Sequence, residues 1–296
     1  MVAATTTITV GERSITLTSQ HKPMFPDDGI TKGELVDYYR DVAPFMLPHV
    51  HDRPLTLQAY PSGIAGMKYY QKQIGERFPE WMERATMLSK DEGETTYVLA
   101  NEAATIVYLA NQNCITFHVC SVKPPRLDRP DLLILDLDPS DNDFEKVREG
   151  ALALRPMLTE MGLVPYVKTS GSRGLHVVAP IEPRDDQDAV RHVGKAIADR
   201  LVALAPDRFT VEMTKKKRGD RVFVDYLRNG AAQTVAAPYT VRGLPTAPVA
   251  TPLLWDELDD PRLHARSFTL RNVRERLEKL GDPWRDMMRD ARALED

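Results

Sequence analysis

The first chemical feature of the sequence is a pair of aspartates that ends an apolar run. Asp136 and Asp138 close the segment LLILDLD, whose branched residues predict a strand. Alternate residues of a strand point to the same face, so the two carboxylates would lie roughly 6 to 7 Å apart. Hard divalent cations prefer carboxylate oxygens, and a pair of such cations can promote phosphoryl or nucleotidyl transfer. The pair predicts a metal site, with helix-capping acids as the alternative.

A third acid lies in a second apolar run, VFVDYL, which contains Asp225. A buried lone carboxylate is costly unless it meets a cation or a hydrogen-bond donor. Asp141 and Asp143 are better placed to cap the helix that follows the first run, which leaves Asp136 and Asp138 without a capping role. We therefore expect these three acids to share one catalytic, metal-binding site.

Between the acid pair and the third acid lies a turn rich in glycine and hydroxyl groups, TSGSRGLH, from Thr169 to His176. Glycines let backbone amides approach phosphate oxygens, serines donate hydrogen bonds, and the guanidinium of Arg173 can bind an oxyanion with two N–H groups. An ordinary tight turn has the same composition. Its position among the acids favours a site for a triphosphate.

These residues require an α/β framework to position them. Apolar side chains at helical spacing predict three helices, of which the first starts at a capping box formed by Thr31 and Glu34. Short runs of branched and aromatic residues predict strands before and after the turn. The first predicted helix begins at Thr31, and the other two cover Asp143–Met161 and Asp186–Leu204. The predicted strands are 132–138, 164–168, 175–179 and 222–227. The stretch 240–260 reads as irregular, and a helix is expected from Ser267.

Composition limits the possible functions. The 296 residues are 42% hydrophobic and carry a net charge of -4, which suits one large domain or two packed lobes and argues against coating nucleic acid through bulk positive charge. Nucleic acid would need a local basic groove, for which the cluster from Lys215 to Arg218 is a candidate, with a solvated loop as the alternative. Two cysteines cannot supply a disulfide framework or a four-ligand zinc site, and no leader or membrane-spanning run is evident. A cytoplasmic protein is expected.

Several further residues fit binding roles as well as ordinary structural ones. His118 and His176 lie in apolar runs, where a buried, hydrogen-bonded histidine is expected rather than a metal ligand. Lys22 and Lys32 flank a loop that enters a helix start, where free amides favour phosphate. The adjacent pair Tyr69 and Tyr70 could stack on bases.

Together these segments resemble the polymerase domain of bacterial ligase D, a branch of the archaeo-eukaryotic primase superfamily. The resemblance runs through KPMFP, GITKGELVDYY, LPHVHDRPLTLQAYPSGIAG, YYQKQ, LILDLDPS, KTSGSRGLHV, VFVDYLRNG, APYTVRG and WDELDDP, which cover nearly the whole chain. It implies a mixed α/β primase-polymerase core with two sheet-containing lobes flanked by helices around a central acidic cleft. The domain would occupy 1–296, with a core of about 11–287 and neither a ligase nor a nuclease domain.

The resemblance also implies the reaction. A primer 3'-hydroxyl would attack the α-phosphate of a ribo- or deoxynucleoside triphosphate at gaps and double-strand breaks, in non-homologous end joining, with two Mn²⁺ or Mg²⁺ ions. The expected partners are DNA with a 5'-phosphate, a separate ATP-dependent ligase and a Ku-type protein, in the cytoplasm or on the nucleoid and without a membrane. The implied site residues are Asp136, Asp138 and Asp225 for metals; His118, Ser170, Ser172, Arg173, His176, Arg218, Arg228 and Arg242 for the nucleotide; Lys22 and Lys32 for the 5'-phosphate; and Tyr69 and Tyr70 for template stacking.

Some positions depart from the family pattern. Arg173 stands where many relatives carry a lysine, which keeps the charge but changes its geometry. The stretch from Leu57 to Tyr60 is less basic than usual, which puts DNA contacts there in doubt. No lysine lies in a K-x-D-G context, so we do not expect this chain to seal nicks.

Two other functions fit part of the pattern. A haloacid-dehalogenase-type phosphatase would use LILDLDPS, Thr169 or Ser170, and GDRVFVD as its motifs. In that fold the last acid follows its strand, whereas Asp225 is expected inside one, and the first strand normally opens the chain. A catalytically inactive module that binds DNA ends is the third possibility, against which the retention of all three acids argues.

Overall fold

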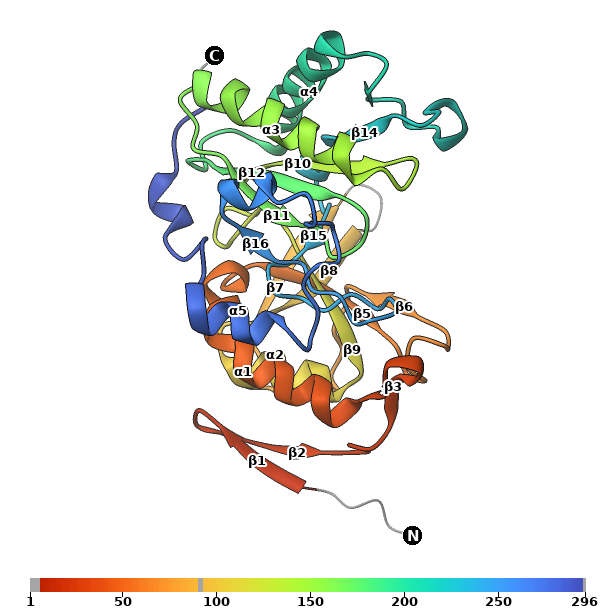
Figure 1. Cartoon of the computed structure of the whole chain (residues 1–296). Coiled ribbons are helices and arrows are strands. Elements are labelled where there is room, and N and C mark those ends of the chain that lie inside the picture. The colour runs from red at the N-terminus through yellow and green to blue at the C-terminus, as the bar shows by residue number, and fades with distance from the viewer. Residues whose placement is uncertain (1–5, 90–92, 295–296) are drawn as a thin grey trace. The chain divides into compact units, whose positions relative to one another are not determined.

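The computed structural model of this chain describes residues 6–89 and 93–294, so the predicted domain 1–296 extends beyond the described residues. The chain divides into two compact units, and it passes from one to the other several times (Figure 1). Unit 1 comprises Met1–Val119, Ala236–Val249 and Phe268–Gly281. Unit 2 comprises Cys120–Val235, Ala250–Ser267 and Asp282–Asp296. Each unit contains helices and a sheet, which confirms the expected mixed α/β class.

Unit 1 is built on a sheet with the strand order β15-β9-β5-β8-β7, in which β6 pairs with β5. The chain enters this unit through the β1–β2 hairpin and returns to it for α5. The strands are β1 (Thr6–Val10), β2 (Arg13–Leu17), β3 (Pro23–Phe25), β4 (Ile30–Thr31), β5 (Pro54–Ala59), β6 (Tyr69–Gln71), β7 (Arg84–Ser89), β8 (Gly93–Leu99), β9 (Cys114–Val119) and β15 (Val235–Ala236), the last at the unit boundary. The helices are α1 (Lys32–Val50), α2 (Ala103–Asn111), α5 (Val273–Leu280) and the 3-10 turn η1 (Pro26–Asp28).

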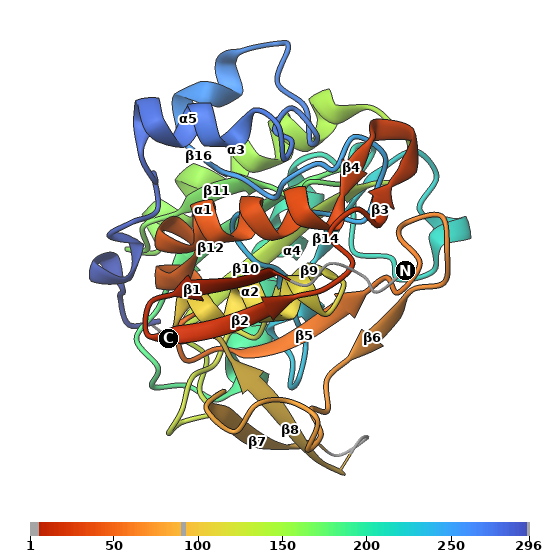
Figure 2. The same cartoon turned by 90° about the horizontal axis from the view of Figure 1, so that it is seen from below.

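Helix α1 begins where the sequence predicts it. The Thr31 side chain accepts the N–H of Glu34, and the Glu34 carboxylate accepts the N–H of Thr31. Its apolar stripe is buried, and α1 packs beside α2 (Figure 2). Helix α2 was not predicted, because its short sequence AATIVYLAN is buried over most of its surface and therefore lacks an amphipathic period.

Unit 2 contains the sheet β13-β14-β10-β12-β11-β16, in which only the β13–β14 pair is parallel. Helices α3 and α4 pack on this sheet and on each other (Figure 1). The strands are β10 (Leu132–Pro139), β11 (Tyr166–Thr169), β12 (Leu175–Pro180), β13 (Phe209–Thr210), β14 (Val222–Asp225) and β16 (Pro252–Leu253). The helices are α3 (Phe144–Glu160), α4 (Gln187–Leu204), η2 (Lys215–Lys217), η3 (Leu227–Asn229), η4 (Trp255–Asp259) and η5 (Met287–Asp290).

The predicted helices of unit 2 also start at the expected residues. The Asp143 carboxylate accepts the N–H of Glu145 at the start of α3, and the Asp186 carboxylate accepts the N–H of Ala189 at the start of α4. Four predicted strands correspond to β10, β11, β12 and β14 within two residues at either end.

Two boundaries differ from expectation. Asp225 is the last residue of β14 rather than an interior one, since the chain turns into η3 directly afterwards. The expectation that Asp225 lies inside its strand, and so differs from the last acid of a phosphatase, is therefore wrong. The last helix begins at Val273, not at Ser267, because the backbone of Thr269 forms a bridge to Pro248 and its N–H donates to Asn272. No helix within 6–89 and 93–294 is long and apolar enough to cross a membrane.

Candidate active site

The acids of unit 2 lie in a row across its sheet. Asp136 on β10 pairs with Asp225 on β14 and, on its other side, with His176 on β12. His176 in turn pairs with Lys168 on β11. Residues directly opposite each other on adjacent strands project to the same face, so these four side chains share one face of the sheet. Asp138, two residues along β10, points to that face as well.

Arg228 bridges two of the acids. Its Nε lies 3.0 Å from Oδ2 of Asp225 and 3.5 Å from Oδ2 of Asp136. On the other side, Nε2 of His176 lies 3.5 Å from Oδ1 of Asp136. Burial raises the pKa of Asp136 to about 6, and the neighbouring charges of Asp225 and Asp138 raise it while that of Arg228 opposes the rise. The charged form of the Asp136 carboxyl group is therefore disfavoured in the folded protein. An additional cation beside it would stabilise that charged form.

Arg173 neutralises the remaining acid. Its Nη2 lies 2.8 Å and 2.9 Å from the two carboxylate oxygens of Asp138. In this arrangement, guanidinium groups contact all three aspartates of the site. In the described part of the chain, no group of three or more His, Cys, Asp or Glu side chains is arranged to hold a metal ion. The three-aspartate metal site thus stays a prediction.

The glycine-rich turn packs directly against the acid strand. A Cβ added at Gly174 would lie 1.7 Å from the carbonyl oxygen of Leu137, the residue between the two aspartates. Gly171 adopts a φ of 65°, which favours glycine. Glycine is therefore needed for the turn to approach the acids this closely.

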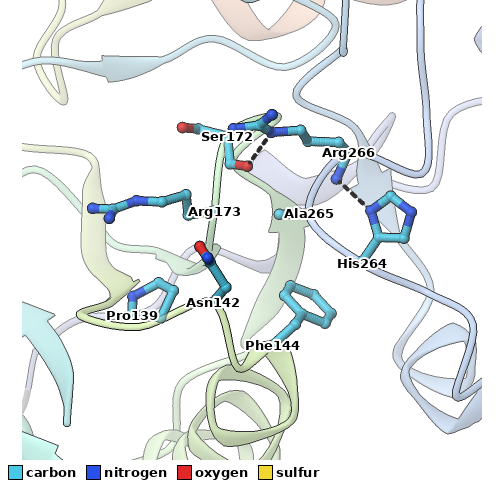
Figure 3. A pocket seen from close by; sticks show the side chains of 8 residues that line it. All are labelled: Pro139, Asn142, Phe144, Ser172, Arg173, His264, Ala265 and Arg266. Atoms are coloured by element: carbon cyan, nitrogen blue, oxygen red, sulfur yellow. Dashed lines mark hydrogen bonds between the residues drawn. The ribbon is translucent and has the colours of Figure 1, made fainter. Parts of the chain in front are cut away.

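Ser170 organises the turn from within. Its Oγ accepts the N–H groups of Ser172 and Gly174, at 3.2 and 3.1 Å. These two amides are thus used within the turn, and binding of a triphosphate by the turn stays a prediction. The polar side chains of Ser172 and Arg173 line an adjacent pocket of about 310 Å³ (Figure 3).

Arg218 has a local structural role. Its Nε and Nη2 donate to the carbonyl oxygens of Glu212 and Met213, and its guanidinium lies 3.7 Å from the ring centre of Phe223. The three lysines of η2 before it are exposed. Arg218 therefore fixes the basic loop to β14, and its contact with a nucleotide stays a prediction.

The two lysines predicted to bind a 5'-phosphate lie together in unit 1. The N–H of Lys32 donates to the carbonyl oxygen of Lys22 at 2.8 Å, beside the start of α1. Nζ of Lys22 donates to Asn113 and to the carbonyl of Pro61, and Nζ of Lys32 donates to Thr18. Burial lowers the pKa of Lys22, and burial followed by the charge of Lys22 lowers the pKa of Lys32 to about 8. An anion between the two ammonium groups would relieve this repulsion.

The other predicted residues of unit 1 form a second group. Tyr69 and Tyr70 are 48% and 61% exposed on β6, as base stacking requires. The ring of Tyr70 lies edge-on to His118, with 5.9 Å between ring centres. The charge of Arg242 acts on Tyr60, whose pKa burial raises to about 12. Both groups belong to unit 1, whereas the three aspartates belong to unit 2.

Comparison with known proteins identifies the family. The family model described as the LigD primase-polymerase domain matches residues 31–284, a range that contains every predicted site residue except Lys22. The chain belongs to this family. Of its curated relatives, the multifunctional non-homologous end joining DNA repair protein LigD of Mycobacterium tuberculosis is 34% identical over 92% of the chain, and LigD of Pseudomonas aeruginosa is 32% identical over 88%.

The LigD family assignment has structural support. The polymerase domain of Mycobacterium tuberculosis ligase D, solved in complex with DNA, aligns with a TM-score of 0.88 and 34% identity. The alignment covers 94% of this chain and 99% of that domain. The chain spans only about a third of the two curated relatives, 36% and 31% of their lengths. The likeness therefore concerns the polymerase domain of LigD.

Sequence reasoning missed three residues of this LigD-like site. Lys168 is 1% exposed, pairs with His176, and its charge acts against the raised pKa of Asp136. A lysine inside the apolar strand YVKT was the available signal, because lysine is seldom buried without a partner. His264 and Arg266 line the pocket beside Arg173. No local pattern in the sequence indicates that these two residues lie near the turn.

Proposed function

We propose that this chain is a DNA-dependent nucleotidyltransferase that fills gaps and extends broken ends in non-homologous end joining. The proposal rests on the aspartates of unit 2 and the glycine-rich turn that packs against them. The aspartates could hold two cations, and the turn has groups that could bind a triphosphate. The family assignment supports it, as do the names of the relatives, which describe non-homologous end joining, and the relative solved with DNA.

The proposed reaction is a displacement at the α-phosphorus of the nucleoside triphosphate. The oxygen of a primer 3'-hydroxyl forms a bond to the α-phosphorus, and the bond from that phosphorus to the bridging β-phosphate oxygen breaks. The hydroxyl proton is lost to solvent or a nearby base, and pyrophosphate leaves. The side chains of Arg173 and Ser172 would bind the triphosphate, and Arg228 would hold Asp136 and Asp225 in place.

The donor set fits divalent cations. Asp136, Asp138 and Asp225 present only carboxylate oxygens, the ligands preferred by Mg²⁺ and Mn²⁺. Their charges are at present offset by Arg173 and Arg228, which would give up part of these contacts. Two bound ions would stabilise the attacking oxygen and the leaving pyrophosphate.

The residues of unit 1 would recognise the nucleic acid. Lys22 and Lys32 would bind the 5'-phosphate of a gap, since they form a pair of partly buried ammonium groups. Tyr69 and Tyr70 would stack on template bases, and His118 would contact the sugar, with ribonucleotides preferred. A separate ATP-dependent ligase and a Ku-type protein would complete the repair.

Primer extension tests the proposal. A labelled primer on a gapped duplex with a 5'-phosphate is incubated with Mn²⁺ and either ribo- or deoxynucleotides. The Asp138→Ala variant should lose extension by about 1,000-fold or more, because each essential electrostatic group contributes several kcal/mol. Asp128→Ala is the matched control, since Asp128 is 74% exposed and lies outside the site.

Two outcomes would favour the alternatives. Extension that is absent in the unchanged protein, together with hydrolysis of p-nitrophenyl phosphate that depends on Asp136, would indicate a phosphatase. Tight binding to 5'-phosphorylated gaps with neither reaction would indicate a DNA-end-binding module.

A further inference from the structure

A pocket lined by basic and polar groups lies beside the glycine-rich turn. It measures about 310 Å³ and lies entirely within unit 2, between the turn, the start of α3 and the segment that follows η4 (Figure 3). Its lining contains two arginines, a histidine, an asparagine and a serine, with no aspartate or glutamate. The lining residues are Pro139, Asn142, Phe144, Ser172, Arg173, His264, Ala265 and Arg266. This chemistry favours an anion.

Arg266 is held in the pocket wall by the turn itself. Its Nε–H donates to the carbonyl oxygen of Ser172 at 2.8 Å, across 94 residues of sequence (Figure 3). This bond uses one of the five N–H donors of a guanidinium. The bond holds the guanidinium beside Ser172, in the wall of a pocket that Arg173 also lines.

His264 is fixed in one tautomer by a local bond. The backbone N–H of Arg266 donates to Nδ1 of His264 at 3.1 Å (Figure 3). A ring nitrogen that accepts an N–H has no hydrogen of its own, so Nε2 carries the hydrogen in the neutral ring. Nε2 is thus a hydrogen-bond donor even when the ring is uncharged, as an anion site requires.

Arg173 connects the pocket to the acids. Arg173 is one of the residues that line the pocket, and its Nη2 contacts both carboxylate oxygens of Asp138. An anion in the pocket would therefore lie next to the acid row, separated from Asp138 by a single side chain. Pyrophosphate, the leaving group of the proposed reaction, has the charge and the oxygens that this lining would satisfy.

We propose that this pocket binds the leaving pyrophosphate, and that His264 and Arg266 are binding residues for it. The inference rests on the proposed nucleotidyl transfer, because only that reaction releases pyrophosphate at this site. It assigns the two residues a role in product retention, which is separate from binding of the nucleotide base or of DNA.

Calorimetric titration of the full chain with inorganic pyrophosphate tests the inference directly, and product inhibition of primer extension supplies a second measurement. Arg266→Ala and His264→Asn should each weaken pyrophosphate binding and product inhibition by about 10-fold, the effect of one charge-assisted hydrogen bond. Asparagine keeps an acceptor for the Arg266 N–H but lacks the Nε2 donor. His264→Asn thus tests binding without removing the bond from Arg266 to the turn, which Arg266→Ala does remove.

Arg262→Ala is the matched control, because Arg262 belongs to the same segment, is 89% exposed and pairs with Asp260 outside the pocket. It should leave pyrophosphate binding unchanged. Equal pyrophosphate affinity in His264→Asn and the unchanged protein would overturn the inference, even if extension proceeds normally. Absence of extension by the unchanged protein would instead overturn the proposed function, whatever the pyrophosphate titration gives.

Discussion

Nη2 of Arg173 lies between the two carboxylate oxygens of Asp138, at 2.8 Å and 2.9 Å. The guanidinium thus contacts both oxygens of the carboxylate, while the same residue lines the neighbouring pocket. Because the two side chains are 41% and 32% exposed, this pair contributes little to folding. In the proposed metal site, Arg173 and a divalent cation would compete for Asp138.

This competition predicts opposite effects of one substitution on two ligands. Arg173→Gln should raise the affinity for Mn²⁺ measured without nucleotide, because the competing charge is lost, and should lower triphosphate affinity by about 10-fold. The free energy of unfolding should change by less than about 1 kcal/mol. Electron paramagnetic resonance titration of Mn²⁺ and binding of a fluorescent triphosphate measure the two affinities. A lower affinity for Mn²⁺ in the variant would contradict the competition.

Gly174 is predicted to tolerate no side chain. In Gly174→Ala the new Cβ would meet the Leu137 carbonyl at 1.7 Å, and a backbone atom cannot move aside as a flexible side chain can. We expect a loss of roughly 2 to 4 kcal/mol in the free energy of unfolding and a strong loss of extension. Thermal unfolding compares it with Gly75→Ala, whose added Cβ meets nothing within 4 Å. Equal stability of the two variants would mean that the turn relaxes freely.

Asp136 is expected to lower the free energy of unfolding while it supports primer extension. Its pKa is raised from 3.8 to about 6, so the folded state binds the proton more tightly than the unfolded state. The free energy of unfolding then falls as pH rises between these two values, and the full cost is present above pH 6. Asp136→Asn should therefore be more stable at pH 7.5 in EDTA, by about 1 to 3 kcal/mol, while losing extension.

The gain in Asp136→Asn should disappear near pH 4, where the native carboxyl is protonated. Asp138→Asn is the comparison, because it removes a carboxylate from the same strand face but also breaks the pair with Arg173. It should give no gain at pH 7.5. Chemical denaturation at both pH values measures the differences, and a destabilised Asp136→Asn at pH 7.5 would show that Arg228 depends on this acid.

Recognition of a 5'-phosphate should weaken in mild alkali. Burial, and after it the charge of Lys22, lowers the pKa of Lys32 to about 8, so Lys32 loses its proton between pH 7 and pH 9. Affinity for a 5'-phosphorylated gap should fall across this range, whereas affinity for a gap with a 5'-hydroxyl should change little. In Lys22→Met the midpoint should move to higher pH, because one cause of the lowered pKa is removed. Fluorescence anisotropy with the two duplexes measures these midpoints, and identical pH profiles would place the phosphate elsewhere.

Much of the local structure was predictable because its causes are local. The capping box of Thr31 and Glu34, and the caps Asp143 and Asp186, fixed three helix starts through side chains within three residues of the cap. The alternation of strand residues placed Asp136 and Asp138 on one face before any pairing was known. Helix α2 escaped prediction because burial on most sides removes the period that marks a helix.

Local sequence patterns therefore identify the acids, the glycine-rich turn and the strands and helices on which they lie. The folded chain was needed to show that Asp225 pairs with Asp136, that Lys168 pairs with His176, and that Arg266 donates to Ser172. The physical reason is that strand register and long-range hydrogen bonds depend on how distant segments pack together. Local periodicity and composition carry no information about which of several strands becomes a neighbour.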